Sequence, residues 1–191
     1  MEILFKKKPV EIIEKIGDNS YKCVYKNQTY FLRQFKDKTS FSNYLENKKY
    51  LRNSGIFIAK VQYKDKKQFL VFEEFIDGEN ALELLAKGPL NEEYYKSIYS
   101  IAFRNKIERI LLDYKPENFK LVSKKLIYLS DRYFRYQEKE NFINKDVYYW
   151  FYSKELLAYF EEKGISTDNL KLKEEYELNK EIVLTTIKYY M

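Results

Sequence analysis

The sequence predicts a two-lobed α+β protein, with strands concentrated in residues 1–76 and helices in residues 77–191. Short apolar runs separated by turn residues fill the first part, whereas apolar residues recur at helical spacing after Asp77-Gly78. Strands followed by helices are typical of α+β folds, in which the two kinds of element are segregated along the chain. We therefore expect a single domain over residues 1–191, with a five-stranded antiparallel sheet and one helix in its first lobe.

Three strands are predicted at the start of the chain. Residues 11–16 and 21–26 are strand-like runs that flank the turn residues 17–20, and residues 29–35 follow a short connection at 26–28. Turn residues between such runs indicate antiparallel hairpins, so we expect the three strands to form a meander.

A helix and a second hairpin complete the predicted first lobe. Ser40 belongs to a residue type that caps helix N-termini, and helical spacing continues from there until Gly55, a residue type that ends helices. Residues 59–63 and 68–75 are apolar and flank the charged turn at 64–67, which predicts two more strands.

Helices dominate the predicted second lobe. Apolar residues at helical spacing predict helices over residues 81–87, 91–104, 145–163 and 172–190. Two short apolar runs, 110–112 and 125–129, lie on either side of Pro116. The chain contains no internal repeat and no low-complexity linker.

The composition excludes several classes of chemistry. The chain of 191 residues has no histidine and one cysteine, Cys23. This excludes a Ser-His-Asp triad, a Cys-His pair, His-ligated zinc, cysteine-ligated metal clusters and an intrachain disulfide. Any chemistry must therefore use carboxylates, amides, lysines, arginines, hydroxyls or a hard metal held by oxygen.

Charge and hydropathy limit the partners and the location of the chain. With 35 Lys+Arg against 29 Asp+Glu, the net charge of +6 suits an anionic partner such as nucleotide phosphate, nucleic acid or an acidic membrane surface. No run has the roughly 18 apolar residues of a membrane-spanning helix, and residues 1–13 lack the pattern of a signal peptide. We expect a cytoplasmic protein with no transmembrane segment, in which Lys6, Lys7 and Lys8 are either solvated or make peripheral contact with an anionic membrane.

The most informative stretch surrounds the two short apolar runs of the second lobe. Asp113, Lys115 and Asn118 follow the first run in the pattern D-x-K-x-x-N, and Asp131 follows the second run, 18 residues after Asp113. This arrangement resembles the catalytic loop and the metal-binding aspartate of the protein-kinase-like superfamily. The resemblance implies a kinase-like fold and a phosphotransferase that uses ATP and Mg²⁺. It implies that Asp113 orients the acceptor hydroxyl and takes its proton, and that Lys115 offsets charge on the transferred phosphoryl group. Asn118 and Asp131 would be the ligands of the metal ion.

A degenerate glycine-rich loop extends the resemblance to the first lobe. Gly17, Asn19, Ser20 and Val24 lie in a stretch similar to the loop that covers the ATP phosphates, with Asn19 and Lys22 in place of the second and third glycines. Asparagine can adopt the positive φ angle that such a turn needs, so Asn19 keeps this turn feasible. The alternative is an ordinary hairpin turn.

Five further residues match the ATP-binding part of the family. Arg33 stands where the family has its strand lysine, and Glu46 matches the ionic partner of that lysine on the following helix. The alternative is an exposed arginine and a surface glutamate. By resemblance, the hinge backbone at Glu73 and Phe75 reads the adenine edge, and Phe72 closes the back of the pocket.

The chain also departs from ordinary protein kinases. Leu111 and Leu112 replace the usual His and Arg before Asp113, and Arg132-Tyr133 replaces Phe-Gly after Asp131. Only a short segment separates Asp131 from Asp146. Asp146 resembles the aspartate that braces the catalytic loop in the family. This compact plan is similar to the bacterial lipopolysaccharide-core heptose and Kdo kinases and to the small atypical kinases of the Bud and Rio groups.

The acceptor and the activity remain open between several hypotheses. The first is phosphate transfer to a hydroxyl of a sugar or a lipopolysaccharide-core-like glycan, and the second is transfer to a protein Ser or Thr. The third is a pseudokinase that binds nucleotide or acts as an inactive scaffold, which Arg33 and the lost glycines favour. A basic nucleic-acid binder is the fourth, but no recognition helix or aromatic sheet motif supports sequence-specific binding.

Overall fold

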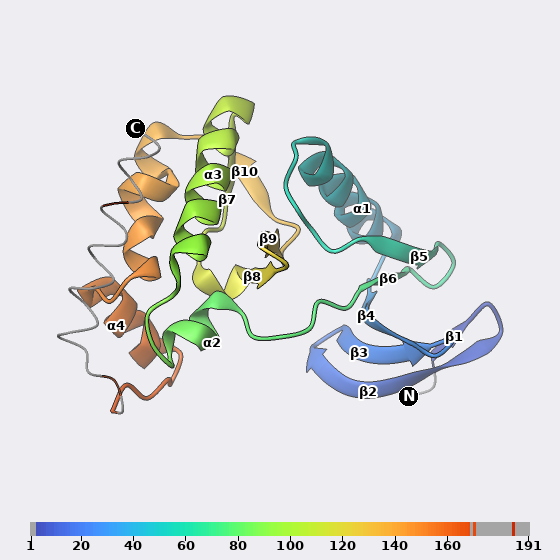
Figure 1. The fold of residues 1–191 in the computed structure, drawn as a ribbon. Coiled ribbons are helices and arrows are strands. Elements are labelled where there is room, and N and C mark those ends of the chain that lie inside the picture. Colours follow the sequence, from blue (N-terminus) through green and yellow to red (C-terminus); the bar gives the residue numbers. More distant parts are fainter. Residues whose placement is uncertain (1–2, 169, 171–184, 186–191) are drawn as a thin grey trace. The chain divides into compact units, whose positions relative to one another are not determined.

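The structure is a computed structural model that describes residues 3–168 together with Leu170 and Thr185. The chain divides into two compact units. The first unit comprises Met1–Tyr50 and Ile58–Asp77, and the second comprises Leu51–Phe57 and Gly78–Met191. The helix predicted over residues 172–190 lies outside the described residues, apart from Thr185. The described residues form an α+β protein, drawn in Figure 1.

An antiparallel sheet of six strands forms the first unit, in the order β1-β2-β3-β4-β6-β5. The predicted meander and the predicted second hairpin are confirmed, but the expected number of five strands is wrong. The additional strand precedes the meander and pairs with β2 through the two-residue turn Lys6-Lys7, whose φ angles are 50° and 64°. Lysine is not a residue type that signals such a turn, so the pattern concealed this hairpin. The strands are β1 (Ile3–Phe5), β2 (Lys8–Gly17), β3 (Ser20–Tyr25), β4 (Gln28–Gln34), β5 (Val61–Asp65) and β6 (Leu70–Glu74).

Each face of this sheet buries a different set of side chains. One face carries a cluster of buried aromatic and aliphatic residues that includes Phe5, Tyr25 and Phe72. Cys23 belongs to the same cluster, and burial raises the pKa of its thiol to about 12, so the thiolate that reacts or binds metal is not formed near neutral pH. The other cluster of the unit contains Val71 of β6 together with residues of the helix that follows β4.

Helix α1 (Lys38–Asn53) follows β4, close to the predicted position. Its N-cap is Asp37 and not Ser40, because Asp37 Oδ1 accepts a hydrogen bond of 2.8 Å from the Ser40 backbone N–H. The predicted stop at Gly55 is confirmed. Gly55 has a φ of 75°, and the next backbone N–H, that of Ile56, donates to the Leu51 carbonyl over 3.0 Å.

The second unit combines helices with two small antiparallel ladders. Asparagine side chains cap its first two helices, since Asn80 accepts from Glu83 N–H and Asn91 accepts from Tyr94 N–H. One ladder pairs β7 with β10, and the other pairs β8 with β9. The elements are α2 (Ala81–Leu85), α3 (Glu92–Glu108), β7 (Ile110–Leu112), β8 (Phe119–Val122), β9 (Lys125–Tyr128), β10 (Tyr133–Arg135) and α4 (Lys154–Glu162).

The single helix predicted over residues 145–163 is wrong. A π-helical turn at Phe142–Asp146 and a 3₁₀ turn at Val147–Trp150 come first, and the chain is then extended at Phe151. Helix α4 starts anew after Ser153, whose Oγ accepts from Leu156 N–H. The break follows from tertiary burial, because Trp150 is fully buried and its indole N–H donates to the Tyr114 carbonyl over 2.7 Å.

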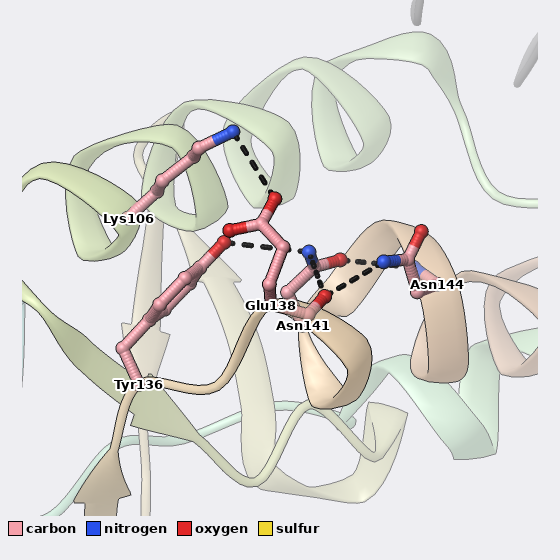
Figure 2. A network of polar contacts seen from close by, with 5 residues as sticks. All are labelled: Lys106, Tyr136, Glu138, Asn141 and Asn144. Carbon is pink, nitrogen blue, oxygen red and sulfur yellow. Dashed lines mark hydrogen bonds and ion pairs between the residues drawn. The ribbon is translucent and has the colours of Figure 1, made fainter.

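A polar network ties the segment after β10 to helix α3 (Figure 2). Lys106 on α3 lies 3.4 Å from a carboxylate oxygen of Glu138. The side-chain amides of Asn141 and Asn144 both donate to the Glu138 carbonyl over 2.7 Å, and Asn141 also donates to the Tyr136 hydroxyl over 3.3 Å. These bonds satisfy the Glu138 carbonyl and fix side chains in a segment that has no long helix or strand of its own.

None of the helices in the described part of the chain is both long and apolar enough to cross a membrane.

Candidate functional site

The Tyr128 hydroxyl joins the two segments that carry Asp113 and Asp131. Leu112 of β7 pairs with Tyr133 of β10, so Asp113 and Arg132 follow and precede that pair on facing strands. The Tyr128 hydroxyl accepts from the Asp113 backbone N–H over 3.2 Å and donates to the Arg132 carbonyl over 2.9 Å. Burial raises the pKa of Tyr128 to about 12, and the negative charges of Asp113 and Asp131 add to this rise. The backbones of Asp113 and of Arg132, the residue after Asp131, therefore meet at one buried hydroxyl.

Removal of this hydroxyl tests its structural role. We expect Tyr128→Phe to lower the free energy of unfolding by about 1–3 kcal/mol, because two backbone groups lose their partner. Urea unfolding of both proteins measures the difference. Tyr148→Phe, at a side chain that is 42% exposed, is the matched control and should stay within about 0.5 kcal/mol of the wild type. Equal losses in the two variants would show that Tyr128 does not hold the segments together.

Asn118 is folded back onto Asp113 by a tight turn. Its side-chain NH₂ donates to the Asp113 carbonyl over 3.3 Å, and its own carbonyl accepts from Leu129 N–H over 2.8 Å. The turn is a 3₁₀ helix over Pro116–Asn118, and proline suits its first position because the ring presets φ. The structure thus places Asn118 next to both Asp113 and Leu129.

Buried side chains of the second unit hold the loop that carries Asp113 in place. Tyr114 follows Asp113 and is fully buried, and its hydroxyl accepts from the Asn105 side chain over 2.7 Å. Its carbonyl accepts the Trp150 indole N–H. The break in the predicted helix at Phe151 therefore accompanies a contact between Trp150 and the loop that carries Asp113.

Lys115 does not extend into solvent. Its ammonium lies 3.2 Å from the centroid of the Tyr149 ring and 4.1 Å from that of Tyr159. The Tyr159 hydroxyl donates to the Glu117 carboxylate, which also lies 3.6 Å from the Lys163 ammonium. Cation–π attraction thus holds Lys115 against two rings that the sequence motif does not include.

Asp146 is buried close to this loop. Only 9% of the residue is exposed, and burial raises the pKa of its carboxyl to about 6. The cations of Lys145 and Lys115 oppose the rise, whereas the carboxylate of Asp113 adds to it. The chain therefore carries a buried carboxyl beside its motif, and the bracing role of Asp146 stays a prediction.

The raised pKa of Asp146 makes stability depend on pH with a defined sign. An acid whose pKa is higher in the folded chain stabilises the fold fully below its unfolded pKa of 3.8, and this contribution is lost as pH rises through about 6. We expect Asp146→Asn to match the wild type near pH 4 and to exceed it at pH 7 by roughly 2–3 kcal/mol. Urea unfolding between pH 4 and 7 tests this, with the exposed Asp77→Asn as the control. Parallel curves for Asp146→Asn and the wild type would contradict it.

The donor set at Asn118 and Asp131 suits magnesium. The Asn118 NH₂ group is directed to the Asp113 carbonyl, which turns its amide oxygen the other way. An amide oxygen and a carboxylate are hard ligands, and Mg²⁺ bound to phosphates commonly uses only one or two protein carboxylates. The described residues contain no cluster of three or more acidic or cysteine side chains that could hold a metal, so a site here depends on these few ligands.

The predicted phosphate-covering loop is an ordinary two-residue hairpin turn. Gly17 and Ser20 are paired as the last residue of β2 and the first of β3, and Val24 lies within β3. Asn19, which could adopt a positive φ, does not do so. A Cβ at Gly17 would meet its nearest neighbour, Ser20 Cβ, at 3.8 Å, which is an ordinary contact distance. Neither Gly17 nor Asn19 therefore stands at a position that requires glycine. The Asn19 carbonyl accepts from Gln34 N–H over 2.9 Å, which ties the turn to β4.

The buried ion pair of the first unit is not the one that the sequence predicts. Glu46 is exposed on α1, whereas Lys48, two residues further and on another face of the helix, places its ammonium 2.9 Å from Glu73 Oε1 of β6. The Tyr44 hydroxyl donates to the other Glu73 oxygen over 2.6 Å. Arg33 of β4 lies with its guanidinium 4.8 Å from the Tyr44 ring centroid. The buried ion pair of this unit therefore joins α1 to β6 through Lys48 and Glu73.

The predicted hinge residues occupy three different surroundings. Glu73 lies on β6 between β4 and β5, and only 2% of the residue is exposed, so its predicted contact with adenine stays a prediction. Phe72 is fully buried in the aromatic cluster with Phe5 and Tyr25. Phe75 is the first residue after β6, and the Lys22 ammonium lies 4.6 Å from its ring centroid.

The comparisons with known proteins add no assignment. Neither a model of a known protein family nor a curated protein matches the chain.

Four residues that contact the candidate site residues or form the buried ion pair were not predicted from the sequence motifs. Tyr128 and Lys48 act through contacts with residues distant in the chain, as do Tyr149 and Tyr159. With 20 tyrosines and many lysines in the chain, their residue types carry little information. The position of Lys48 on the apolar stripe of α1, in line with Tyr44, is the one available signal of burial.

Proposed function

We propose that the protein is an ATP- and Mg²⁺-dependent phosphotransferase that acts on a hydroxyl acceptor. One observation carries the proposal. Asp113, Asn118 and Asp131 come from two segments, which are held together by the Tyr128 hydroxyl and by the hydrogen bond from the Leu129 N–H to the Asn118 carbonyl. Two carboxylates and an amide in this arrangement match the needs of phosphoryl transfer, which demands positioning and charge neutralisation more than covalent catalysis.

Each residue has a role that follows from its chemistry. Asp113 orients the acceptor hydroxyl and takes its proton, since a positioned carboxylate is a suitable general base. The Asn118 amide oxygen and the Asp131 carboxylate would hold Mg²⁺. The bound ion supplies positive charge that neutralises the phosphate oxygens. Tyr128 keeps the Asp113 backbone in place through a bond that does not use the carboxylate.

The acceptor that fits best is a sugar or a lipopolysaccharide-core-like glycan. Between Asp131 and Asp146 the chain forms the short strand β10, a 3₁₀ turn over Glu138–Glu140 and a π-helical turn. These elements leave no long segment on which a peptide could be aligned. A small hydroxyl compound needs no such segment, which favours it over a protein Ser or Thr.

A second candidate is a protein that binds nucleotide without efficient transfer. Two observations favour it: the Lys115 ammonium lies against Tyr149 and Tyr159, and the turn at Gly17 lacks the glycine-dependent conformation of a phosphate loop. On this account Lys115 does not compensate charge on the transferred group.

A thermal titration tests the metal-dependent nucleotide site. A ligand at 100 times its dissociation constant stabilises the native state by about 2.7 kcal/mol, so ATP with Mg²⁺ should raise the melting temperature of the chain. Asp131→Asn should lose the part of this rise that depends on Mg²⁺, whereas the exposed Asp77→Asn should keep it. An identical response to ATP with Mg²⁺ and with EDTA would contradict the proposed metal site.

A further inference from the structure

A cavity of about 170 Å³ lies within the second unit, outside the residues discussed above for phosphate transfer. Three segments line it: the chain after α1, one side of α3, and the turn between β8 and β9. Neither the loop 113–118 nor Asp131 is among its lining residues. A role for this cavity would therefore be separate from the proposed reaction.

The charge of the lining is uniformly positive. Arg104 of α3 and Lys124 and Lys125 of the β8–β9 turn line the cavity, and no lining residue is acidic. The nearest compensation is Glu93, whose carboxylate lies 3.5 Å from the Lys124 ammonium in a largely exposed pair. An exposed pair of this kind is weak and is readily exchanged for another anion.

Arg104 is held in place by the backbone of the same cavity. One of its terminal nitrogens donates to the Gly55 carbonyl over 2.7 Å. Gly55 has a φ of 75°, and a Cβ there would lie 2.6 Å from that nitrogen. Glycine therefore permits both the local conformation and the approach of the guanidinium. The bond uses one of the five guanidinium N–H donors, so a fixed fork of donors is presented at the cavity wall.

Hydroxyl and apolar groups complete the lining. Ser97 and Ser100 on α3 provide hydroxyls, and Ile101 of α3 with Leu126 of β9 provides apolar surface. Phe57, which is 46% exposed, lies at the same cavity, with the Lys125 ammonium 5.0 Å from its ring centroid. A group with one anionic end and a small organic body fits these three kinds of contact.

We propose that this cavity binds the phosphate group of a small phosphomonoester. Arg104 and the two lysines contact the phosphoryl oxygens, because charge-assisted hydrogen bonds to phosphate are strong and arginine matches its geometry. The serine hydroxyls bind the remaining oxygens, and Phe57 with Ile101 covers the organic body. The site is independent of the proposed phosphate transfer.

Chemical-shift titration of the ¹⁵N-labelled full chain tests the site, with glycerol 3-phosphate and inorganic phosphate as probes. We expect both probes to shift the amides of Ser97, Ser100 and residues 124–126, and glycerol 3-phosphate to bind more tightly. The double variant Lys124→Gln/Lys125→Gln should weaken binding of glycerol 3-phosphate about 100-fold, as expected for the loss of two charge-assisted hydrogen bonds that each contribute about tenfold. Both side chains are exposed, so the variant should fold.

The matched control is Lys66→Gln/Lys67→Gln, which removes two adjacent exposed lysines from the β5–β6 turn. It should leave the affinity unchanged. An equal loss of affinity in both double variants would overturn the proposal, because binding would then follow net charge alone. Equal affinity for the two probes would overturn the role given to the organic body. Loss of phosphate transfer in Asp113 variants has no bearing on these outcomes, so the two proposals fail separately.

Discussion

Asp113→Asn is expected to lower the rate of phosphate transfer by about 10²–10⁴-fold, the usual contribution of a general base. The substitution keeps the size of the side chain and removes its ability to take a proton. It also leaves the two backbone bonds of residue 113 in place, from its N–H to Tyr128 and from Asn118 to its carbonyl. Steady-state kinetics with ATP, Mg²⁺ and a sugar acceptor measures the rate.

Two controls separate a loss of chemistry from a loss of structure. The melting temperature of Asp113→Asn should stay close to that of the wild type, and its response to ATP with Mg²⁺ should persist. The exposed Asp77→Asn should retain full activity. Full activity in Asp113→Asn would remove the residue from the reaction and with it the proposed mechanism.

Lys48→Met is expected to have the largest effect on stability, a loss of about 3–5 kcal/mol. Lys48 and Glu73 are 4% and 2% exposed, and their ion pair links α1 to β6. Methionine fills a similar volume, but it leaves the Glu73 carboxylate buried without its cation, although the Tyr44 hydroxyl still donates to one of its oxygens. Urea unfolding of the variant measures the loss, and the exposed neighbour Lys49→Met is the control, with an expected change within about 0.5 kcal/mol.

The double variant Lys48→Met/Glu73→Leu identifies the physical cause. Replacing both charges with apolar side chains removes the uncompensated charge, so the double variant should recover most of the stability that Lys48→Met loses. A double variant as unstable as the sum of the two single variants would show that the attraction itself, and not the stranded carboxylate, dominates.

The strand pattern of the first unit could be predicted because local signals agree there. Alternating apolar residues and turn residues place β2, β3 and β4, and Gly55 ends α1 where the chain needs a positive φ. Strand β1 was missed because Lys6-Lys7 forms its turn without a typical turn residue. The break before Ser153 was missed because burial of Trp150 overrides the helical spacing of that segment.

The candidate site was only partly predictable for the same reason. The positions of Asp113, Asn118 and Asp131 follow from spacing, because the two short ladders that flank them set their separation. The Lys48–Glu73 pair depends on how one helix packs on one strand, which no local pattern records. The surroundings of Lys115 likewise depend on Tyr149 and Tyr159, more than 30 residues further along the chain.

The fate of the γ-phosphate of radiolabelled ATP, incubated with the purified chain and with sugar, protein or water as acceptor, tests the central claim most directly. The account predicts that label leaves ATP only when Mg²⁺ is present, at a rate that falls to background in Asp113→Asn. A wild-type chain that binds ATP with Mg²⁺ but transfers label no faster than Asp113→Asn would contradict the account.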